Sequence, residues 1–135
     1  MPEPPAPRPL IVVDAANVIG SRPDGWWRDR AGAARRLLSR LARSDLKNRG
    51  EVVVVLEGVA RRAAPPGVQD GIRVDHAPRS GDDRIVQVVT ETAQADPARP
   101  ITVVTADRGL RARVTAHGAR VLGPRSLWEQ LEREP

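Results

Sequence analysis

The sequence predicts an α/β fold, a three-layer α/β/α sandwich with a central parallel sheet of about five strands. Short runs of branched apolar residues recur along the chain, and segments with helical spacing or loops separate them. Runs that are apolar throughout, without alternation, are typical of strands buried on both faces. Regular alternation of such strands with helices is typical of a parallel sheet that helices cover on both faces.

Length and composition limit the possible sites. A chain of 135 residues predicts one domain with a single core. It has no cysteine, which excludes disulfides, thiolate zinc sites and cysteine nucleophiles and favours a cytoplasmic location. With only two histidines, a metal ion would have oxygen ligands, which favours Mg²⁺ or Mn²⁺ over zinc. No apolar stretch reaches the roughly 18 residues of a membrane span, so no membrane contact is expected.

The charge of the chain favours a polyanionic partner. The formal net charge is +5 and the isoelectric point is about 11.2, values that are typical of nucleic-acid-binding proteins. A second explanation remains open. Only Lys47 among the 22 basic residues is a lysine, a bias that genomic base composition alone can produce.

The N-terminal part begins with a proline-rich segment and a buried strand. Residues 1–9 carry five prolines, so they are predicted to be a disordered leader before a single domain of residues 10–135. Residues 10–13 are the first strand, which ends at Asp14. Residues 18–25 contain two glycines and a proline and are predicted to be a loop.

The remaining elements follow from the same patterns. Apolar positions 27, 31, 34, 38, 41 and 42 have helical spacing and predict the first long helix. The later predicted strands are residues 52–56, 72–76, 101–105 and 119–122. The later predicted helices begin at about residue 82, at residue 110 and at residue 124. The segment 60–71, rich in arginine, proline and glycine, is predicted to be a mobile basic loop.

Four carboxylates occupy related positions in this pattern. Asp14, Glu57 and Asp107 follow predicted strands, and Asp82 lies in the first turn of the helix after the strand at 72–76. In a parallel sheet these positions share one edge, where ligands bind. Like charges gathered there repel unless a cation holds them, and a divalent cation would support hydrolysis of a phosphodiester. Taken singly, each acid has an equally good explanation as a cap or a loop residue.

Other polar and aromatic residues have candidate roles around these acids. Asn17 can hydrogen-bond Asp14 or a substrate, or it can simply form a turn. Thr105 can offer its hydroxyl at the end of a strand, or it can fill that strand as a β-branched residue. Arg108 can contact a phosphate or lie in solvent.

The three tryptophans are the only aromatic residues. Trp26 lies off the apolar stripe and is flanked by Arg22 and Arg28, so it is the best candidate for stacking on a base. An indole held under its own loop would give the same pattern. Trp27 and Trp128 are in phase with apolar neighbours and are predicted to lie in the core.

Five blocks of the sequence resemble, in order, the NYN domain and in particular its bacterial YacP-like branch. They are IVVD at residues 11–14 with Asn17, VVVLEG at 53–58, GDDRI at 81–85, VVTADR at 103–108 and GARV at 118–121. The resemblance covers nearly all of residues 10–133 and implies a PIN-like fold and metal-dependent ribonuclease activity. It places Asp14, Asp82 and Asp107 at the acidic positions of the family. Glu57 stands where relatives often have aspartate, and residues 21–27 do not map to the general pattern.

The resulting hypothesis is a Mg²⁺- or Mn²⁺-dependent endoribonuclease. The ion is expected at Asp14, Asp82 and Asp107 with support from Asp83 or Glu57, while Asn17 and Thr105 position water or phosphate. The residues expected to bind RNA, single-stranded RNA being favoured, are Arg22, Trp26, Arg28, Arg61, Arg62 and Arg108.

Two other hypotheses use the same acids. One is a non-catalytic RNA- or nucleotide-binding module. The other is a receiver-like phosphoacceptor domain, which is disfavoured because it needs a lysine near the end of the last strand and the only lysine is Lys47. The sequence leaves open which RNA is cut, whether a ribosome or another protein presents it, how many metal ions bind, and the oligomeric state.

Overall fold

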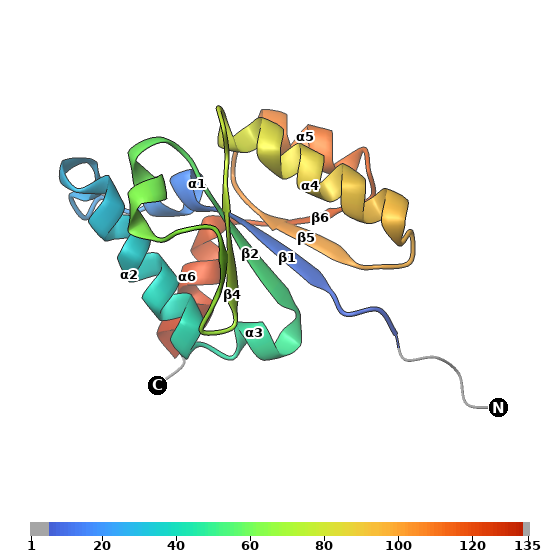
Figure 1. Ribbon diagram of the computed structural model, residues 1–135, viewed down its shortest axis with the longest axis horizontal. Helices are drawn as coiled ribbons and strands as arrows, with labels where there is room; N and C mark the ends of the chain where they lie inside the picture. The colour runs from blue at the N-terminus through green and yellow to red at the C-terminus, as the bar shows by residue number, and fades with distance from the viewer. Residues whose placement is uncertain (1–5, 134–135) are drawn as a thin grey trace.

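A computed structural model describes residues 6–133 and shows a six-stranded sheet between two layers of helices (Figure 1). The strand order is β3-β4-β2-β1-β5-β6, and every neighbouring pair is parallel except β3 and β4. The strands are β1 (Leu10–Asp14), β2 (Glu51–Leu56), β3 (Gly67–Gln69), β4 (Ile72–His76), β5 (Ile101–Val104) and β6 (Arg120–Leu122). The predicted α/β class is confirmed, with one antiparallel edge strand more than expected.

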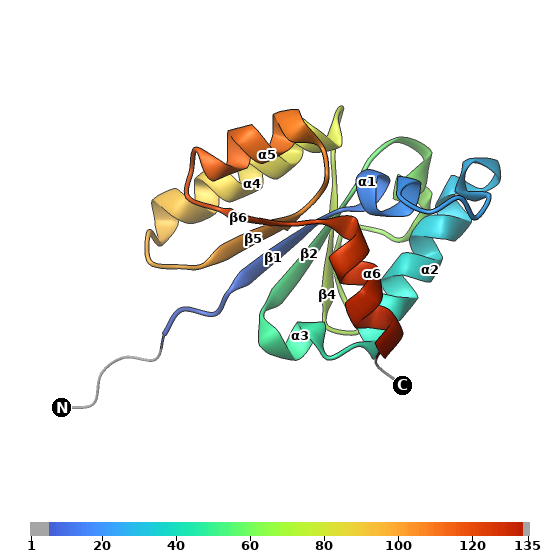
Figure 2. The same ribbon diagram turned by 180° about the vertical axis from the view of Figure 1, so that it is seen from behind.

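Helices cover both faces of the sheet. The α-helices are α1 (Ala15–Gly20), α2 (Arg30–Arg43), α3 (Leu46–Arg49), α4 (Gly81–Ala95), α5 (Arg108–Thr115) and α6 (Pro124–Arg133), and the 3₁₀ turns are η1 (Trp26–Arg28) and η2 (Gly58–Ala63). Helices α4 and α5 lie on one face, whereas α1, α2 and α6 lie on the other (Figures 1 and 2). In the part of the chain that the structure describes, no helix is both long and apolar enough to cross a membrane.

Two hydrophobic clusters, one on each face, hold the layers together. On one face Val13 of β1 packs in a cluster with Leu37 and Leu41 of α2. On the other face Val12 packs in a cluster with Ile85 of α4. All of these side chains are fully buried, and burying each one contributes about 1.5–3 kcal/mol. Because both faces of β1 are covered, its carboxyl end is held rigidly between the layers.

Two segments that were predicted to be loops contain regular structure. The predicted loop at 18–25 overlaps α1, which begins directly after β1 because the Asp14 carboxylate accepts a hydrogen bond from the Asn17 N–H at 3.3 Å. The predicted loop at 60–71 contains part of η2 and β3, which pairs with β4. A tight turn joins these two strands, with φ of 53° at Asp70 and 80° at Gly71.

The prediction that Trp27 lies in the core is wrong. Its side chain is 52% exposed, and Trp26 packs against the buried cluster instead. The reason is that α2 begins only at Arg30, where the Asp29 carboxylate accepts a hydrogen bond from the Gly32 N–H at 2.8 Å. Trp27 therefore belongs to the preceding 3₁₀ turn and does not share the helical phase. Trp128 is partly buried against the cluster, in agreement with the prediction.

The end of the proline-rich segment is attached to the domain. Residues 1–5 of the predicted leader lie outside the described residues. Arg8 donates hydrogen bonds to the carbonyl oxygens of Lys47 and Gly50 at 2.6 and 3.0 Å. The Pro9 carbonyl accepts from the Glu51 N–H at 2.8 Å. Contacts with the domain thus begin at least two residues before β1.

Candidate active site

The four carboxylates singled out in the sequence lie at one edge of the sheet. Asp14 ends β1, Glu57 follows β2, and Asp107 follows β5. Asp82 is the second residue of α4, which comes after β4. Since β1, β2, β4 and β5 are mutually parallel, their carboxyl ends bring these side chains to the same edge of the sheet.

Asp14 is the buried centre of this group. Its side chain accepts hydrogen bonds at both oxygens, from the Thr105 hydroxyl at 2.9 Å and from the Asn17 N–H at 3.3 Å. The pKa of Asp14 is raised from 3.8 to about 6, mainly by burial and to a smaller extent by the charges of Asp82 and Glu57, while the two hydrogen bonds oppose the rise. Asp14 therefore holds its negative charge at a cost that a nearby cation would remove.

Asp82 is under the same electrostatic influence. Its pKa is raised, first by burial and then by the charges of Asp107 and Glu57, while Arg113 acts in the opposite direction. Glu57 thus acts on both Asp14 and Asp82. The four carboxylates form one group of mutually repelling charges, which we call the acidic cluster: Asp14, Glu57, Asp82 and Asp107.

Glycine at position 81 brings two members of the acidic cluster together. The Glu57 carboxylate accepts a hydrogen bond from the Gly81 N–H at 3.2 Å. A Cβ atom at position 81 would lie 2.9 Å from the other oxygen of that carboxylate, closer than ordinary packing allows. The missing side chain of Gly81 therefore lets Glu57 lie against the first turn of α4.

Asn17 and Thr105 connect the elements that carry the acids. The Asn17 side-chain oxygen accepts a hydrogen bond from the Ala106 N–H at 2.8 Å. The Thr105 hydroxyl, which donates to Asp14, also accepts from the Asp107 N–H at 3.2 Å. Asp107 in turn caps α5 by accepting from the Leu110 N–H at 2.9 Å. The Thr105 hydroxyl, predicted to position water or phosphate, is thus engaged in holding Asp14 and Asp107 in place.

Asp83 lies beside the acidic cluster. Its side chain is 71% exposed and forms an ion pair with Arg113 of α5 at 3.0 Å. The charge of Asp83 raises the pKa of Asp82, and it is the smallest of the causes that shift that pKa. To help hold a metal ion, as predicted, Asp83 would have to break its ion pair with Arg113.

The donor chemistry of the acidic cluster fits a hard divalent cation. Carboxylate oxygens are the ligands that Mg²⁺ and Mn²⁺ prefer. Burial and the repulsion between the acids raise the pKa values of Asp14 and Asp82, and a bound cation would oppose both effects. Among residues 6–133, no three acidic or histidine side chains form a ready-made metal cage. Mg²⁺ does not need such a cage, because proteins usually hold it with one or two carboxylates together with water and substrate phosphates.

The arginines predicted to bind RNA fall into two groups. Arg61 and Arg62 are exposed on η2 and, with Val59 and His76, line a hollow of about 510 Å³ next to Glu57. We call this the basic hollow. Arg108 is exposed at the start of α5, directly after Asp107. These three arginines lie close in sequence to the clustered acids.

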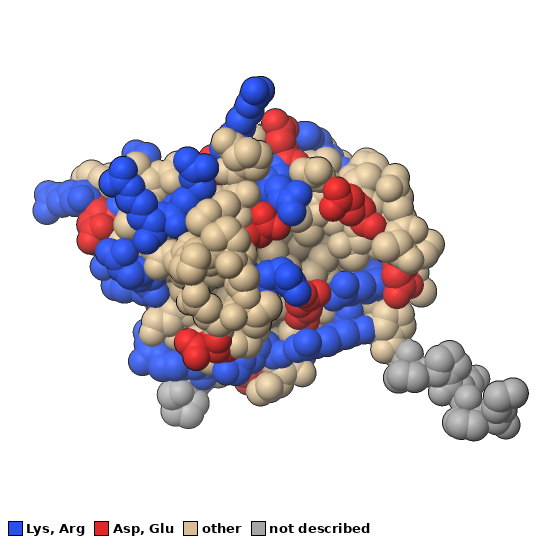
Figure 3. Space-filling view, viewed as in Figure 1, with Lys and Arg blue, Asp and Glu red and all other residues tan. Residues whose placement is uncertain are grey.

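The other predicted arginines are engaged away from the acids. The Arg22 guanidinium lies 4.4 Å from the centre of the Trp128 ring and forms an ion pair with Glu132. The Arg28 guanidinium lies 5.9 Å from the centre of the exposed Trp27 ring. Figure 3 shows that basic side chains also gather on the side of the molecule formed by α2.

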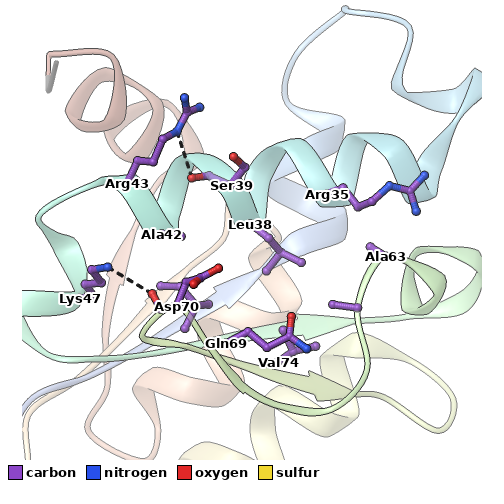
Figure 4. Close-up of a pocket in the computed structure, with 12 residues that line it drawn as sticks. Arg35, Leu38, Ser39, Ala42, Arg43, Lys47, Ala63, Gln69, Asp70 and Val74 are labelled. Carbon is purple, nitrogen blue, oxygen red and sulfur yellow. Dashed lines mark hydrogen bonds between the residues drawn. The ribbon is translucent and has the colours of Figure 1, made fainter.

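A pocket of about 560 Å³ lies between α2 and the β3–β4 hairpin (Figure 4). Leu38 points from α2 towards the hairpin, which contributes Val74 to the lining. Lys47 at its rim donates a hydrogen bond to the Asp70 carbonyl at 3.2 Å. None of the clustered acids lines this pocket, so it contributes no catalytic group.

Two residues of the site were not singled out from the sequence. Gly81 could have been recognised from the sequence, because it directly precedes Asp82 and Asp83 at the predicted start of a helix. A glycine is not needed there for capping, so its presence indicates a close approach of another group. Arg113 has no such signal, since nothing in the sequence distinguishes it from the other arginines of α5.

Comparison with known proteins identifies the family and the fold of the chain. A model of the YacP-like NYN domain matches residues 11–135. Two crystal structures of Rae1 (YacP) from Bacillus subtilis are similar in fold. A single-substitution mutant aligns with a TM-score of 0.74 at 22% identity over 93% of this chain and 76% of that chain. The other aligns with a TM-score of 0.70 at 21% identity over 92% and 74%. No curated protein sequence matches the chain.

Proposed function

Because the chain belongs to the YacP-like NYN domain family of PIN-like nucleases, we propose that it is a metal-dependent ribonuclease that hydrolyses RNA phosphodiester bonds within the strand. One observation supports the proposal most strongly. A buried aspartate with a pKa raised to about 6 lies within reach of the charges of two further carboxylates. Carboxylates with strongly perturbed pKa values cluster at functional sites, and a bound cation would relieve the repulsion between these charges.

Asp14, Asp82 and Asp107 would hold the ion, with Glu57 beside them. A bound Mg²⁺ or Mn²⁺ supplies Lewis acidity towards the phosphodiester and makes water nucleophilic near neutral pH. Thr105 and Asn17 are positioning residues. They fix Asp14 against the loop that carries Asp107, through the hydrogen bonds described above, so that the carboxylates keep their places when substrate binds.

The basic residues next to the acids would bind the RNA backbone. Arg61 and Arg62 of the basic hollow follow β2, and Arg108 follows β5, the two strands that flank β1 and Asp14. Single-stranded RNA is favoured as the substrate because its unpaired bases are free to stack on protein side chains. The same surface would also accept RNA that a ribosome or another protein presents. The absence of cysteine supports a cytoplasmic location.

Replacing Asp107 by Asn tests the proposal without removing the cap of α5, since Asn caps helices as well as Asp does. Cleavage of single-stranded RNA with Mn²⁺ should fall by at least two orders of magnitude, because a charged ligand is lost. RNA affinity, measured by fluorescence anisotropy, should stay within a few fold. Asp29→Asn is the matched control, because Asp29 caps α2 in the same way and does not belong to the acidic cluster.

The non-catalytic RNA-binding module remains the second candidate function. It is favoured by Glu57, which stands where relatives of the family often have aspartate. This alternative predicts RNA binding without metal-dependent turnover. Cleavage by the wild-type chain that Asp107→Asn abolishes would exclude it, whereas equal cleavage by both proteins would remove Asp107 from the active site.

A further inference from the structure

We propose that a pocket between α1 and η2, next to Glu57, binds one unstacked nucleobase of the RNA beside the cleaved phosphodiester. The pocket has a volume of about 320 Å³, at the small end of the range for ligand sites. We call it the base pocket. Its assignment to a substrate base rests on the proposed ribonuclease function.

The lining of the base pocket has the composition of a base-binding site. Trp26 supplies an aromatic surface, while Ile19 of α1 and Ala60 of η2 supply aliphatic contacts. Trp26 is held in place because its indole also packs against the buried cluster of the α2 face. A fixed aromatic ring at the wall of a small pocket favours stacking with a flat π system, and each of the four bases has one.

Two charged groups complete the base pocket. Glu57 lies in its lining and can accept hydrogen bonds from the N–H groups of a base. Arg30 is also part of the lining, and its guanidinium lies 5.6 Å from the centre of the Trp26 ring. It can donate to a base carbonyl or to the adjoining phosphate. Since all four bases carry polar edges beside their flat faces, this combination of a carboxylate, a cation and an indole suits a nucleobase better than a purely apolar ligand.

The position of the base pocket links it to the proposed reaction. Glu57 belongs both to its lining and to the acidic cluster. On the other side, Gly58 and Val59 line both the base pocket and the basic hollow of Arg61 and Arg62. A nucleotide whose base enters the pocket would therefore have its phosphate close to the acids and to these arginines.

An exposed apolar side chain marks the entrance. Val59 lines the base pocket and is 49% exposed, one of three large hydrophobic side chains in residues 6–133 with such exposure. A base that enters would cover it. The pocket of Figure 4, by contrast, contains neither an aromatic side chain nor one of the clustered acids.

The test compares wild type with Ala16→Leu and Trp26→Leu. Ala16 is exposed on α1 and lines the base pocket, so a leucine there fills the pocket without removing a packing contact. Trp27→Leu is the matched control, because Trp27 does not line the pocket although its ring packs edge-on against the Trp26 ring, with the centroids 5.9 Å apart. The substrate is a 12-nucleotide RNA with one cleavage site, made in versions that each lack the base at one position near that site.

We expect one abasic position to reduce wild-type cleavage by roughly 5- to 150-fold, the effect of losing one stacked base. Ala16→Leu and Trp26→Leu should cleave the intact RNA and this abasic RNA at about the same rate. In Trp27→Leu the missing base should reduce the cleavage rate as much as it does in wild type. Equal sensitivity to the missing base in wild type and Ala16→Leu would overturn the proposal.

A second measurement separates this proposal from the ribonuclease function. Binding of AMP, GMP, CMP and UMP is followed by ligand-observed NMR in the presence of a chelator, where no cleavage is needed. At least one monophosphate should bind to wild type and not to Ala16→Leu. If no RNA is cleaved but this difference is seen, the ribonuclease proposal fails and the base pocket stands. If RNA is cleaved but no monophosphate distinguishes the two proteins, the base pocket fails and the ribonuclease proposal stands.

Discussion

Asp14→Asn is expected to stabilise the folded chain at pH 8 and to destabilise it slightly at pH 4. Burial, with the charges of Asp82 and Glu57, raises the pKa of Asp14 in the folded chain from 3.8 to about 6, so the folded state binds the proton more tightly than the unfolded state. The stabilisation from protonated Asp14 is fully present below about pH 4 and is lost as the pH rises through about 6.

The magnitude follows from the size of the shift. Each unit of pKa difference is worth about 1.4 kcal/mol, so the ionisation of Asp14 costs roughly 3 kcal/mol of folding stability at pH 8. Asparagine avoids this cost. It removes the carboxylate to which the Thr105 hydroxyl donates, a loss of about 1 kcal/mol at every pH. The variant should therefore be about 2 kcal/mol more stable at pH 8 and about 1 kcal/mol less stable at pH 4.

Urea denaturation with excess chelator at the two pH values measures this difference. The relevant quantity is the stability of the variant minus that of wild type, because contributions of titrating groups outside the acidic cluster cancel. Asp83→Asn is the control, since it removes a carboxylate that is 71% exposed and should change stability by less than about 0.5 kcal/mol at both pH values. A difference between Asp14→Asn and wild type that is the same at pH 4 and pH 8 would refute the reasoning.

Three further predictions concern neighbours of Asp14. Thr105→Val should cost about 1–3 kcal/mol of stability in urea denaturation and should lower kcat more than KM, because a buried hydroxyl that donates to Asp14 is lost. Thr105→Ser keeps the hydroxyl and should restore both stability and kcat; failure to restore them would contradict this role of the hydroxyl. Gly81→Ala should weaken Mn²⁺ binding several-fold in calorimetry, because its Cβ would lie 2.9 Å from a Glu57 oxygen, and unchanged affinity would contradict the placement of Glu57. Arg62→Ala should reduce the slope of log K against log salt for single-stranded RNA by about 0.7, and an unchanged slope would remove Arg62 from the RNA path.

The fold class and the edge that carries the acids could be predicted from the sequence. Strands buried on both faces leave continuous apolar runs, and in a parallel sheet the residue after each run must lie at the carboxyl edge. Asp14 and Asp107 are placed in this way by topology alone. The prediction needed no knowledge of how the side chains pack.

Short elements could not be predicted in this way. Helix α1 has six residues and β3 has three, too few for either to show a period. The start of α2 depends on a single hydrogen bond at Asp29, and residues before that start do not follow the helical phase. The apolar spacing therefore predicts a core position for Trp27 that this residue, in the preceding 3₁₀ turn, does not take.

Contacts between distant residues were also beyond the sequence. The hydrogen bond from Thr105 to Asp14 joins residues of β1 and the end of β5, and the approach of Glu57 to Gly81 joins β2 to α4. Such pairs depend on the register of neighbouring strands and on the packing of helices over them. A single sequence contains no record of either.

The most direct test of the metal-dependent site is cleavage of a mixed single-stranded RNA pool by wild type and by Asp14→Asn, each with Mn²⁺, with Mg²⁺ and with excess chelator. We predict cleavage by wild type with either metal, none with chelator, and none by Asp14→Asn under any condition, while the variant stays folded and binds RNA. Cleavage that persists in chelator, or that Asp14→Asn retains with metal, would contradict a metal-dependent site centred on Asp14.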